Sequence, residues 1–387
     1  MASGLRLGAA QIHEIENQNG DIMARELTVD GTRIHDGGEC YVIAEIGHNH
    51  QGDLEQCKRM FDVAKQCGAN AVKLQKRDNR AMFTKAMYDS PYIHRNSYGA
   101  TYGEHREKLE FNRSQYAELI RYAKQIGISF FSTAFDMPSA DFLADLDMPA
   151  YKIASGDLIN IPLLRHVAKI GKPMIISTGG ASMDDVVRAY RVVMPINPQL
   201  CILQCTSGYP AEFNELNLRV IQTFRERFPD VVVGLSSHDN GIAMAPVAYV
   251  MGARVVEKHF TLNRAAKGTD HAFSLTPEGL HRMVRDLRRA HEALGDGVKR
   301  CYESEKAPLY KMQKKLVAAR DLPIGHVLAV EDIAIKSPND GLPAYEFDNI
   351  VGMRLTAPLK ADDNILYEIL EEAADKRPLQ AAGARVQ

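Results

Sequence analysis

Two histidines and two lysines stand in short apolar runs of the kind that form buried strands. His238 ends the run VVVGLSSH and His259 lies in RVVEKHF, while Lys73 and Lys152 lie inside NAVKLQ and AYKIAS. Two neutral imidazoles can hold one divalent cation and leave coordination positions open for a substrate. Buried lysines are rare unless they are paired, and ammonium groups suit phosphate or carboxylate. These four residues therefore predict a catalytic metal ion beside a bound anion.

The same residues also allow a structural interpretation. The two histidines could be a hydrogen-bonded pair in the core, and each lysine could form an ion pair with Glu45, Glu257 or Asp157. Glu45 closes the run YVIAEIG and is the best candidate for proton transfer, because a carboxylate that faces a metal ion and an anion can be tuned for that task. It could equally be a structural partner of Lys73.

Most of the other apolar runs also turn polar as they end. Hydroxyl groups there would complete an anion cage with the lysines, and they belong to Thr133, Ser155, Ser177 and Ser236. Further polar positions at these ends are Gln75, Ser132, Thr178, Gln204 and Thr206. An unpaired buried polar group costs about 1–3 kcal/mol, so a shared polar site is the simplest explanation. Glycines beside the cage (Gly156, Gly179, Gly180) would let the backbone approach a ligand.

The elements that would position these residues alternate regularly between positions 41 and 295. Short apolar, β-branched runs are each followed by a segment with helical spacing. Continuous apolar strands alternating with helices indicate a parallel sheet that is covered on its faces. Eight such units in ~250 residues predict a closed (β/α)8 barrel, whose active site lies at the carboxyl ends of the strands. A doubly wound open sheet is the alternative. The strands are expected at 41–47, 70–75, 129–135, 150–155, 173–179, 201–207, 231–238 and 254–260.

The amino-acid sequence outside these eight units predicts further structural segments. Residues 1–40 form a lead-in with a hairpin around Asp30 and Gly31. Residues 296–313 are polar without a clear period and are expected to be a linker, residues 314–372 a small β-rich domain, and residues 373–387 a disordered tail. Inside the barrel, residues 76–113 form a long polar and aromatic stretch, which predicts a binding loop at the mouth.

Composition limits the partners and the compartment. The formal net charge of −2 gives no argument for nucleic acid or an anionic membrane as a partner. No apolar run approaches the ~20 residues of a membrane helix, and the first residues lack a secretion signal, so we expect a cytoplasmic protein. The six cysteines show no C-x-x-C pair and are expected to be reduced and structural.

A series of motifs resembles one known family in order and spacing. They are AEIGHNHQG, KLQK, YGEH followed by LEF, YKIASGD, QCTSGYP, GLSSHDNG, EKHF and KGTDHAFSL. Together they resemble the sialic acid synthases (N-acetylneuraminate synthases), and the C-terminal segment is similar to that family's antifreeze-like (SAF) domain. The resemblance extends from about residue 40 to residue 370.

The resemblance implies an activity and a set of roles. Phosphoenolpyruvate would condense with N-acetylmannosamine, its 6-phosphate or a relative, giving a nine-carbon 2-keto sugar acid and phosphate. His238 and His259 would bind Mn2+, or else Mg2+ or Co2+, and Glu45 would be the acid/base. Phosphoenolpyruvate would contact Lys73, Thr133, Lys152, Ser155, Ser177 and Ser236. The sugar would contact Gln75, Asn96, Asp157, Tyr209 and Asp270.

The family also implies a homodimer with exchanged domains, in which the SAF domain of one protomer reaches the partner's active site. An arginine of that domain usually contacts the sugar, and Lys314 stands at its place here. The 76–113 stretch looks closer to the animal-type synthases, some of which take the 6-phosphorylated sugar. Alternatives are a synthase for legionaminic or pseudaminic acid, an aldolase with a lysine Schiff base, and a binding protein with a degenerate barrel.

Overall fold

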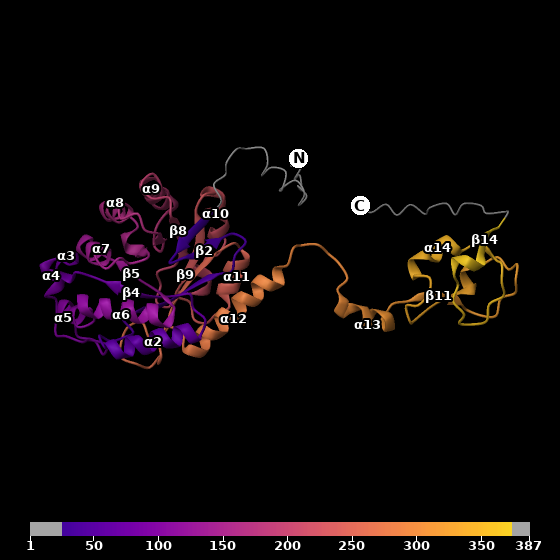
Figure 1. Ribbon diagram of the computed structural model, residues 1–387, viewed down its shortest axis with the longest axis horizontal. Coiled ribbons are helices and arrows are strands. Elements are labelled where there is room, and N and C mark those ends of the chain that lie inside the picture. The colour runs from indigo at the N-terminus through magenta and orange to yellow at the C-terminus, as the bar shows by residue number, and fades with distance from the viewer. Residues whose placement is uncertain (1–24, 374–387) are drawn as a thin grey trace. The chain divides into compact units, whose positions relative to one another are not determined.

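The computed structural model describes residues 25–373, which fall into two compact units with the boundary between Asp296 and Gly297. In the first unit, eight parallel strands close into a barrel in which β10 pairs with β3. Figure 1 shows the strands in the middle of this unit with helices around them. This confirms the predicted (β/α)8 barrel. The strands are β3 (Tyr41–Gly47), β4 (Ala71–Lys76), β5 (Ser129–Ala134), β6 (Tyr151–Ile153), β7 (Met174–Ser177), β8 (Leu200–Cys205), β9 (Val232–Ser237) and β10 (Val255–His259).

Eight main helices surround the barrel, and α12 shows why such segments form. Thr276 caps its first turn by accepting a hydrogen bond from the Gly279 amide, and proline occupies its first position. Its buried residues recur at helical spacing and face the strands. The helices are α2 (Leu54–Gln66), α6 (Arg113–Ile126), α7 (Met137–Ala144), α8 (Ile161–Ala168), α9 (Met183–Val193), α10 (Val220–Arg227), α11 (Met244–Val250) and α12 (Pro277–Leu294).

Side chains alternate along each strand between the barrel interior and the helix layer. On β10, Val255 belongs to the apolar cluster inside the barrel, whereas Val256 packs with the helices. Glu257 and His259 continue the inward row and line a cavity at the carboxyl end. The lower interior is therefore apolar, and the upper interior is polar.

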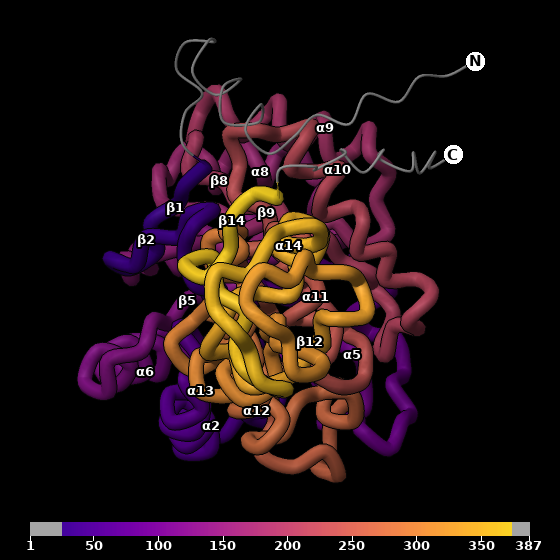
Figure 2. Tube along the Cα trace, turned by 90° about the vertical axis from the view of Figure 1, so that its right-hand side faces the viewer, coloured from indigo at the N-terminus to yellow at the C-terminus, as the bar shows by residue number. Residues whose placement is uncertain are grey.

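A hairpin of β1 (Glu26–Val29) and β2 (Thr32–His35) precedes the barrel, as predicted (Figure 2). Leu27, Val29 and Ile34 are buried in the same cluster as the apolar side chains that fill the lower barrel. The hairpin thus closes the amino end of the barrel interior.

The long stretch after β4 is not a plain loop. It contains the short helices α3 (Asn79–Met82), α4 (Lys85–Tyr88) and α5 (Tyr102–Glu107). Helix α5 begins with a capping box, in which the Thr101 side chain and Glu104 each satisfy the other's backbone amide. This local signal, T-x-x-E, was present in the sequence, but the absence of an apolar period concealed the helix.

The expected linker contains a helix that the sequence did not indicate, α13 (Glu303–Met312). No residue of α13 is buried, so the helix has no apolar stripe to reveal it. The predicted small β-rich domain follows, with β11 paired to β12 and β13 paired to β14. Its elements are β11 (Lys315–Ala318), β12 (Ile333–Lys336), α14 (Phe347–Ile350), β13 (Met353–Leu355) and β14 (Leu370–Glu372).

The remaining expectations concern the cysteines, membrane segments and the tail. All six cysteines are free thiols, and all but the exposed Cys301 are buried. Among residues 25–373, no helix is long and apolar enough to cross a membrane. The predicted tail lies outside the described residues, apart from Ala373.

Candidate active site

A cavity of about 520 Å3 lies at the carboxyl ends of the barrel strands. Most of the residues predicted from strand ends or from the resemblance line it together. They are Glu45, Lys73, Gln75, Thr133, Lys152, Ser155, Ser177, Tyr209, Ser236, His238, His259 and Asp270. The cavity therefore brings the two lysines, the hydroxyls, the carboxylate and the two imidazoles into one space.

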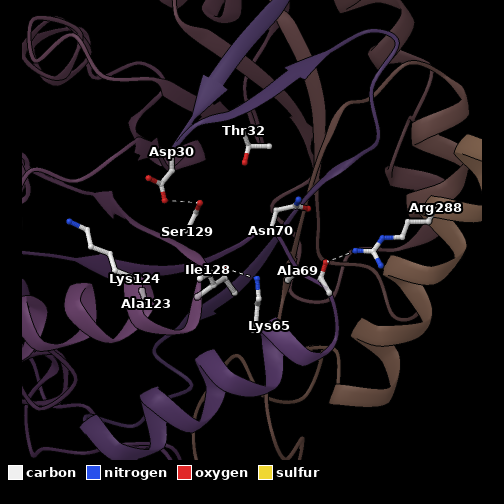
Figure 3. Close-up of a pocket in the computed structure, with 12 residues that line it drawn as sticks. Asp30, Thr32, Lys65, Ala69, Asn70, Ala123, Lys124, Ile128, Ser129 and Arg288 are labelled. Carbon is white, nitrogen blue, oxygen red and sulfur yellow. Dashed lines mark hydrogen bonds between the residues drawn. The ribbon is translucent and has the colours of Figure 1, made fainter.

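A larger cavity, of about 640 Å3, lies at the other end of the barrel beside the β1–β2 hairpin (Figure 3). There Asp30 accepts a hydrogen bond from Ser129, and Lys65 and Arg288 extend from helices toward backbone carbonyls. None of the predicted site residues lines it. Because barrel enzymes carry their chemistry at the carboxyl ends of the strands, we assign the active site to the smaller cavity.

Lys73 is the centre of a buried network. Its Nζ atom lies 2.6 Å from Oε2 of Glu45 and donates to Oγ1 of Thr133 at 2.8 Å. The other oxygen of Glu45 accepts a hydrogen bond from Nε2 of Gln75 at 2.7 Å. Burial raises the pKa of Glu45 to about 7, although the charge of Lys73 opposes this shift. The ion pair considered as the structural alternative thus exists, and it lies inside the cavity.

Lys152 forms the second cationic position. Its Nζ donates to Oγ of Ser177 at 2.6 Å and lies 3.9 Å from Oε1 of Glu257, which is also 3.9 Å from Nζ of Lys73. Ser236 donates to the same Glu257 oxygen at 3.2 Å. Burial opposes ionisation of Glu257, but the two ammonium charges outweigh it and lower the pKa of this carboxyl. Glu257 is thus a counter-ion shared by both lysines, whereas the sequence indicated only a possible ion pair with one of them.

The two histidines face the same space without bonding to each other. Nδ1 of His238 lies 2.9 Å from the carbonyl oxygen of Thr206, to which it donates, so Nε2 keeps its lone pair. Nδ1 of His259 is buried, has no hydrogen-bond partner in the described chain, and lies 3.8 Å from Oδ2 of Asp270. The ring centroids are 5.3 Å apart. Burial lowers the pKa of His259, which favours the neutral form that binds metals.

These atoms fit a cation held by two imidazoles. Within residues 25–373, no group of three or more His, Cys, Asp or Glu side chains is arranged to hold a metal ion. A buried imidazole nitrogen without a partner is costly, and coordination would satisfy it. A two-histidine set leaves the other positions of the ion to substrate and water, as in open catalytic sites.

Some predicted strand-end residues point away from the cavity. Ser132, Thr178, Gln204 and Thr206 bond instead to Tyr116 or to backbone carbonyl oxygens. Each stands one position from an inward-facing neighbour, and successive side chains of a strand face opposite sides. The argument that all polar strand ends converge is therefore wrong for these four residues.

Two residues expected at the sugar, Asn96 and Asp157, do not line the cavity. Asn96 accepts a hydrogen bond from a loop amide at 3.3 Å, and Asp157 accepts one from Asn160 at 3.1 Å. Lys314 belongs to the second unit, where it donates to Ser337 at 2.7 Å. Contact of these three residues with a sugar stays a prediction from the resemblance.

The cavity also contains residues that the sequence did not single out. Arg77 and Arg106 enter from the segment after β4, and Phe273 packs against His259 with ring centroids 4.9 Å apart. Cys205 and Ser207, which precede Tyr209 in the sequence, also line the cavity. The only signal for the arginines was the unusual length of their segment.

Gly47 shows how little space the site leaves. Its φ is +54°, and a Cβ there would lie 3.1 Å from Oε1 of Glu45 and 3.2 Å from Nε2 of Gln75. We expect Gly47→Ala to displace these groups and to lower kcat on the order of 10- to 100-fold. Gly31 is the matched control, because its φ is +78° and a Cβ there would meet nothing within 4 Å. Gly31→Ala should lose about 1 kcal/mol of stability and keep its activity; equal kcat in both variants would contradict the prediction.

Fold and site together define a class of protein: a (β/α)8-barrel enzyme whose cavity places lysines and hydroxyls beside two imidazoles. The NeuB family model matches residues 60–299 and the SAF domain model matches residues 315–371. The chain therefore belongs to the NeuB family, the sialic acid synthases, and carries a C-terminal SAF domain.

Several relatives resemble nearly the whole chain. N-acetylneuraminate-9-phosphate synthase of Homo sapiens is 41% identical over 343 residues, covering 88% of this chain and 96% of the relative. N,N'-diacetyllegionaminic acid synthase of Legionella pneumophila is 36% identical over 338 residues, covering 86% and 95%. The crystal structure of N-acetylneuraminic acid synthetase from Leptospira borgpetersenii matches with a TM-score of 0.65 and 30% identity, over 74% of this chain and 95% of that one.

Proposed function

We propose that this enzyme condenses phosphoenolpyruvate with N-acetylmannosamine or its 6-phosphate, giving N-acetylneuraminate or its 9-phosphate and releasing phosphate. The observation that carries the proposal is the cavity in which Lys73 and Lys152 lie beside Glu45 and the two histidines. The human relative named for this reaction, at 41% identity, supports it.

The chemistry follows from the charges in the cavity. Phosphoenolpyruvate carries a phosphate and a carboxylate, which match the two ammonium groups and the hydroxyls of Thr133, Ser155, Ser177 and Ser236. Its carbon 3 attacks the aldehyde carbon of the open-chain sugar and forms the new carbon–carbon bond. Positive charge then develops at carbon 2, where water adds. The tetrahedral intermediate expels phosphate by carbon–oxygen cleavage and leaves the ketone.

Protons balance within this sequence. The attacking water loses one proton as it adds, and the former aldehyde oxygen gains one; the remaining hydroxyl proton leaves when the ketone forms and is taken up by the departing phosphate. We assign the transfer to Glu45, because its carboxylate is buried in the cavity, where one oxygen pairs with Lys73 and the other accepts a hydrogen bond from Gln75. Gln75, Tyr209 and Asp270 are left to bind the sugar.

A divalent cation would be held by His238 and His259. When bound it acts as a Lewis acid on the sugar carbonyl. We propose Mn2+, with Mg2+ or Co2+ as alternatives. The unpartnered Nδ1 atom of His259 supports this assignment, because it is a buried donor or acceptor that coordination would satisfy.

The test is phosphate release from phosphoenolpyruvate with N-acetylmannosamine, with its 6-phosphate, with a 2,4-diacetamido sugar and with no sugar. Label at the bridging oxygen of phosphoenolpyruvate should appear in the released phosphate. Activity with the diacetamido sugar alone would favour the alternative of a legionaminic acid synthase, the activity for which the Legionella relative is named. Trapping by borohydride with pyruvate would indicate a Schiff-base aldolase instead.

The assembly is a separate proposal. A homodimer in which the SAF domain, with Lys314, reaches the partner's active site rests on the family resemblance, as does the cytoplasmic location. The mass of the protein in solution tests the dimer directly.

A further inference from the structure

Two guanidinium groups line the active-site cavity. Arg77 follows β4 and is only 7% exposed, and Arg106 lies on α5. The plane of Arg77 is fixed by the Phe135 ring, whose centroid lies 3.8 Å from the guanidinium carbon. Arg106 is fixed by two hydrogen bonds to the hydroxyl of Tyr102, at 2.8 and 3.1 Å. Both groups are therefore held in place before any ligand binds.

A single imidazole separates the two guanidinium groups. NH1 of Arg77 is 3.0 Å from Nε2 of His48, and NH1 of Arg106 is 3.3 Å from Nδ1 of the same ring. Burial and the two arginine charges lower the pKa of His48, so the ring is neutral and has one acceptor nitrogen. Only one arginine can donate to it. The other arginine finds no acceptor in this ring.

The neighbouring carboxylates do not remove this excess of donors. Glu110 accepts from Nζ of Lys76 at 2.9 Å, and its other oxygen is 3.6 Å from Nε2 of His48. Asp270 lies 3.8 Å from His259. This part of the site, the arginine corner, therefore contains three cationic side chains but only two carboxylates. The cations are Arg77, Arg106 and Lys76, and the carboxylates are Glu110 and Asp270.

This corner is distinct from the cage for phosphoenolpyruvate but connected to it. NH2 of Arg77 donates to Oε1 of Gln75 at 2.6 Å, and Nε2 of Gln75 donates to Glu45 at 2.7 Å. Lys73 and Gln75 occupy alternate positions on β4, and Arg77 comes directly after the strand, two residues beyond Gln75 at its carboxyl end. Planar guanidinium forks bind phosphate with two parallel hydrogen bonds.

We propose that Arg77 and Arg106 form a second phosphate subsite, which binds the phosphate of the acceptor sugar and makes the 6-phosphorylated sugar the preferred substrate. The inference rests on the proposed function and adds the substrate form and the residues that select it. The reaction that supplies this enzyme must then be a phosphorylation of the sugar at its primary hydroxyl.

The test compares kcat/KM for N-acetylmannosamine 6-phosphate with kcat/KM for N-acetylmannosamine. The wild type should prefer the phosphorylated sugar. Arg106→Gln should lower the ratio of the two values on the order of 10- to 100-fold, mainly through KM, because it removes charge-assisted hydrogen bonds. Arg106→Lys should recover part of the ratio. Arg113→Gln is the control, since Arg113 is exposed on α6 and pairs with Asp145.

Arg106 is the first choice for substitution because Arg77 is more deeply buried, and Arg77→Gln serves as the second variant if its melting temperature is unchanged. A ratio that stays at the wild-type value in folded Arg106→Gln would overturn the subsite. A rise in KM for phosphoenolpyruvate with no change in the ratio would overturn it too. Calorimetric binding of the two sugars separates the subsite from the proposed function: an enzyme that releases no phosphate but binds the 6-phosphate through Arg106 refutes only the proposed reaction.

Discussion

Replacing either cavity histidine with alanine should lower turnover on the order of 10^3-fold, because Lewis-acid stabilisation of the transition state amounts to several kcal/mol. His238 offers Nε2, and His259 has a buried Nδ1 without a partner in the described chain. Neither variant should unfold the barrel, since both rings face the cavity rather than the apolar core. Phosphate release, metal content and melting temperature measure these effects.

A matched control is His166→Ala. His166 lies on α8 and bonds only to the exposed Asp141, so this variant should keep full activity and a bound ion. Chelation of the wild type should reproduce the loss seen in the cavity variants, and added Mn2+ should restore turnover only in the wild type. Full activity in a metal-stripped wild type would refute the assignment.

Glu45→Gln should have the next largest effect, a fall in kcat of roughly 10^2- to 10^4-fold, as expected for loss of a proton-transfer group. The substitution keeps the side-chain volume, so the cavity should retain its shape. It also exchanges an ion pair with Lys73 for a neutral contact. The KM for phosphoenolpyruvate should therefore change less than kcat.

The pH dependence of kcat/KM gives a second signature of Glu45. Burial raises the pKa of this carboxyl to about 7, so it gains a proton as the pH falls below that value. Both of its hydrogen-bond partners, Lys73 and Gln75, are donors directed at a carboxylate, so the ionised form is the competent one. We expect kcat/KM to rise with pH through about 7 and to level off above it. A variant Glu45→Gln that keeps this limb would show that another group is responsible.

The sequence was sufficient for the barrel and for most of the site because charged residues inside apolar strands are costly. Lys73, Lys152 and Glu257 can be tolerated only where they meet one another, and that place is the polar end of the barrel. The positions of such residues therefore mark the inward face of each strand.

Hydroxyl and amide groups give no such mark. Strands of a parallel barrel are buried on both faces, so their apolar runs lack the alternation that would show which side a serine or glutamine faces. Ser132 and Ser177 are alike in the sequence, yet only Ser177 reaches the cavity. The arginines were missed for another reason: they lie on segments whose path depends on tertiary contacts and has no period. Helix α13 was not predicted, because none of its residues is buried and its sequence therefore lacks an apolar stripe.

The β1–β2 hairpin, which fills the amino end of the barrel interior, has a consequence for the order of events. With that end closed, substrates and products share a single entrance. Lys73 lies on β4 and Arg77 directly follows this strand, four residues or roughly 13 Å further along an extended chain at ~3.3 Å per residue. We expect a ligand at Arg77 to hinder passage to Lys73, so that phosphoenolpyruvate binds before the sugar and inorganic phosphate leaves after the sugar acid.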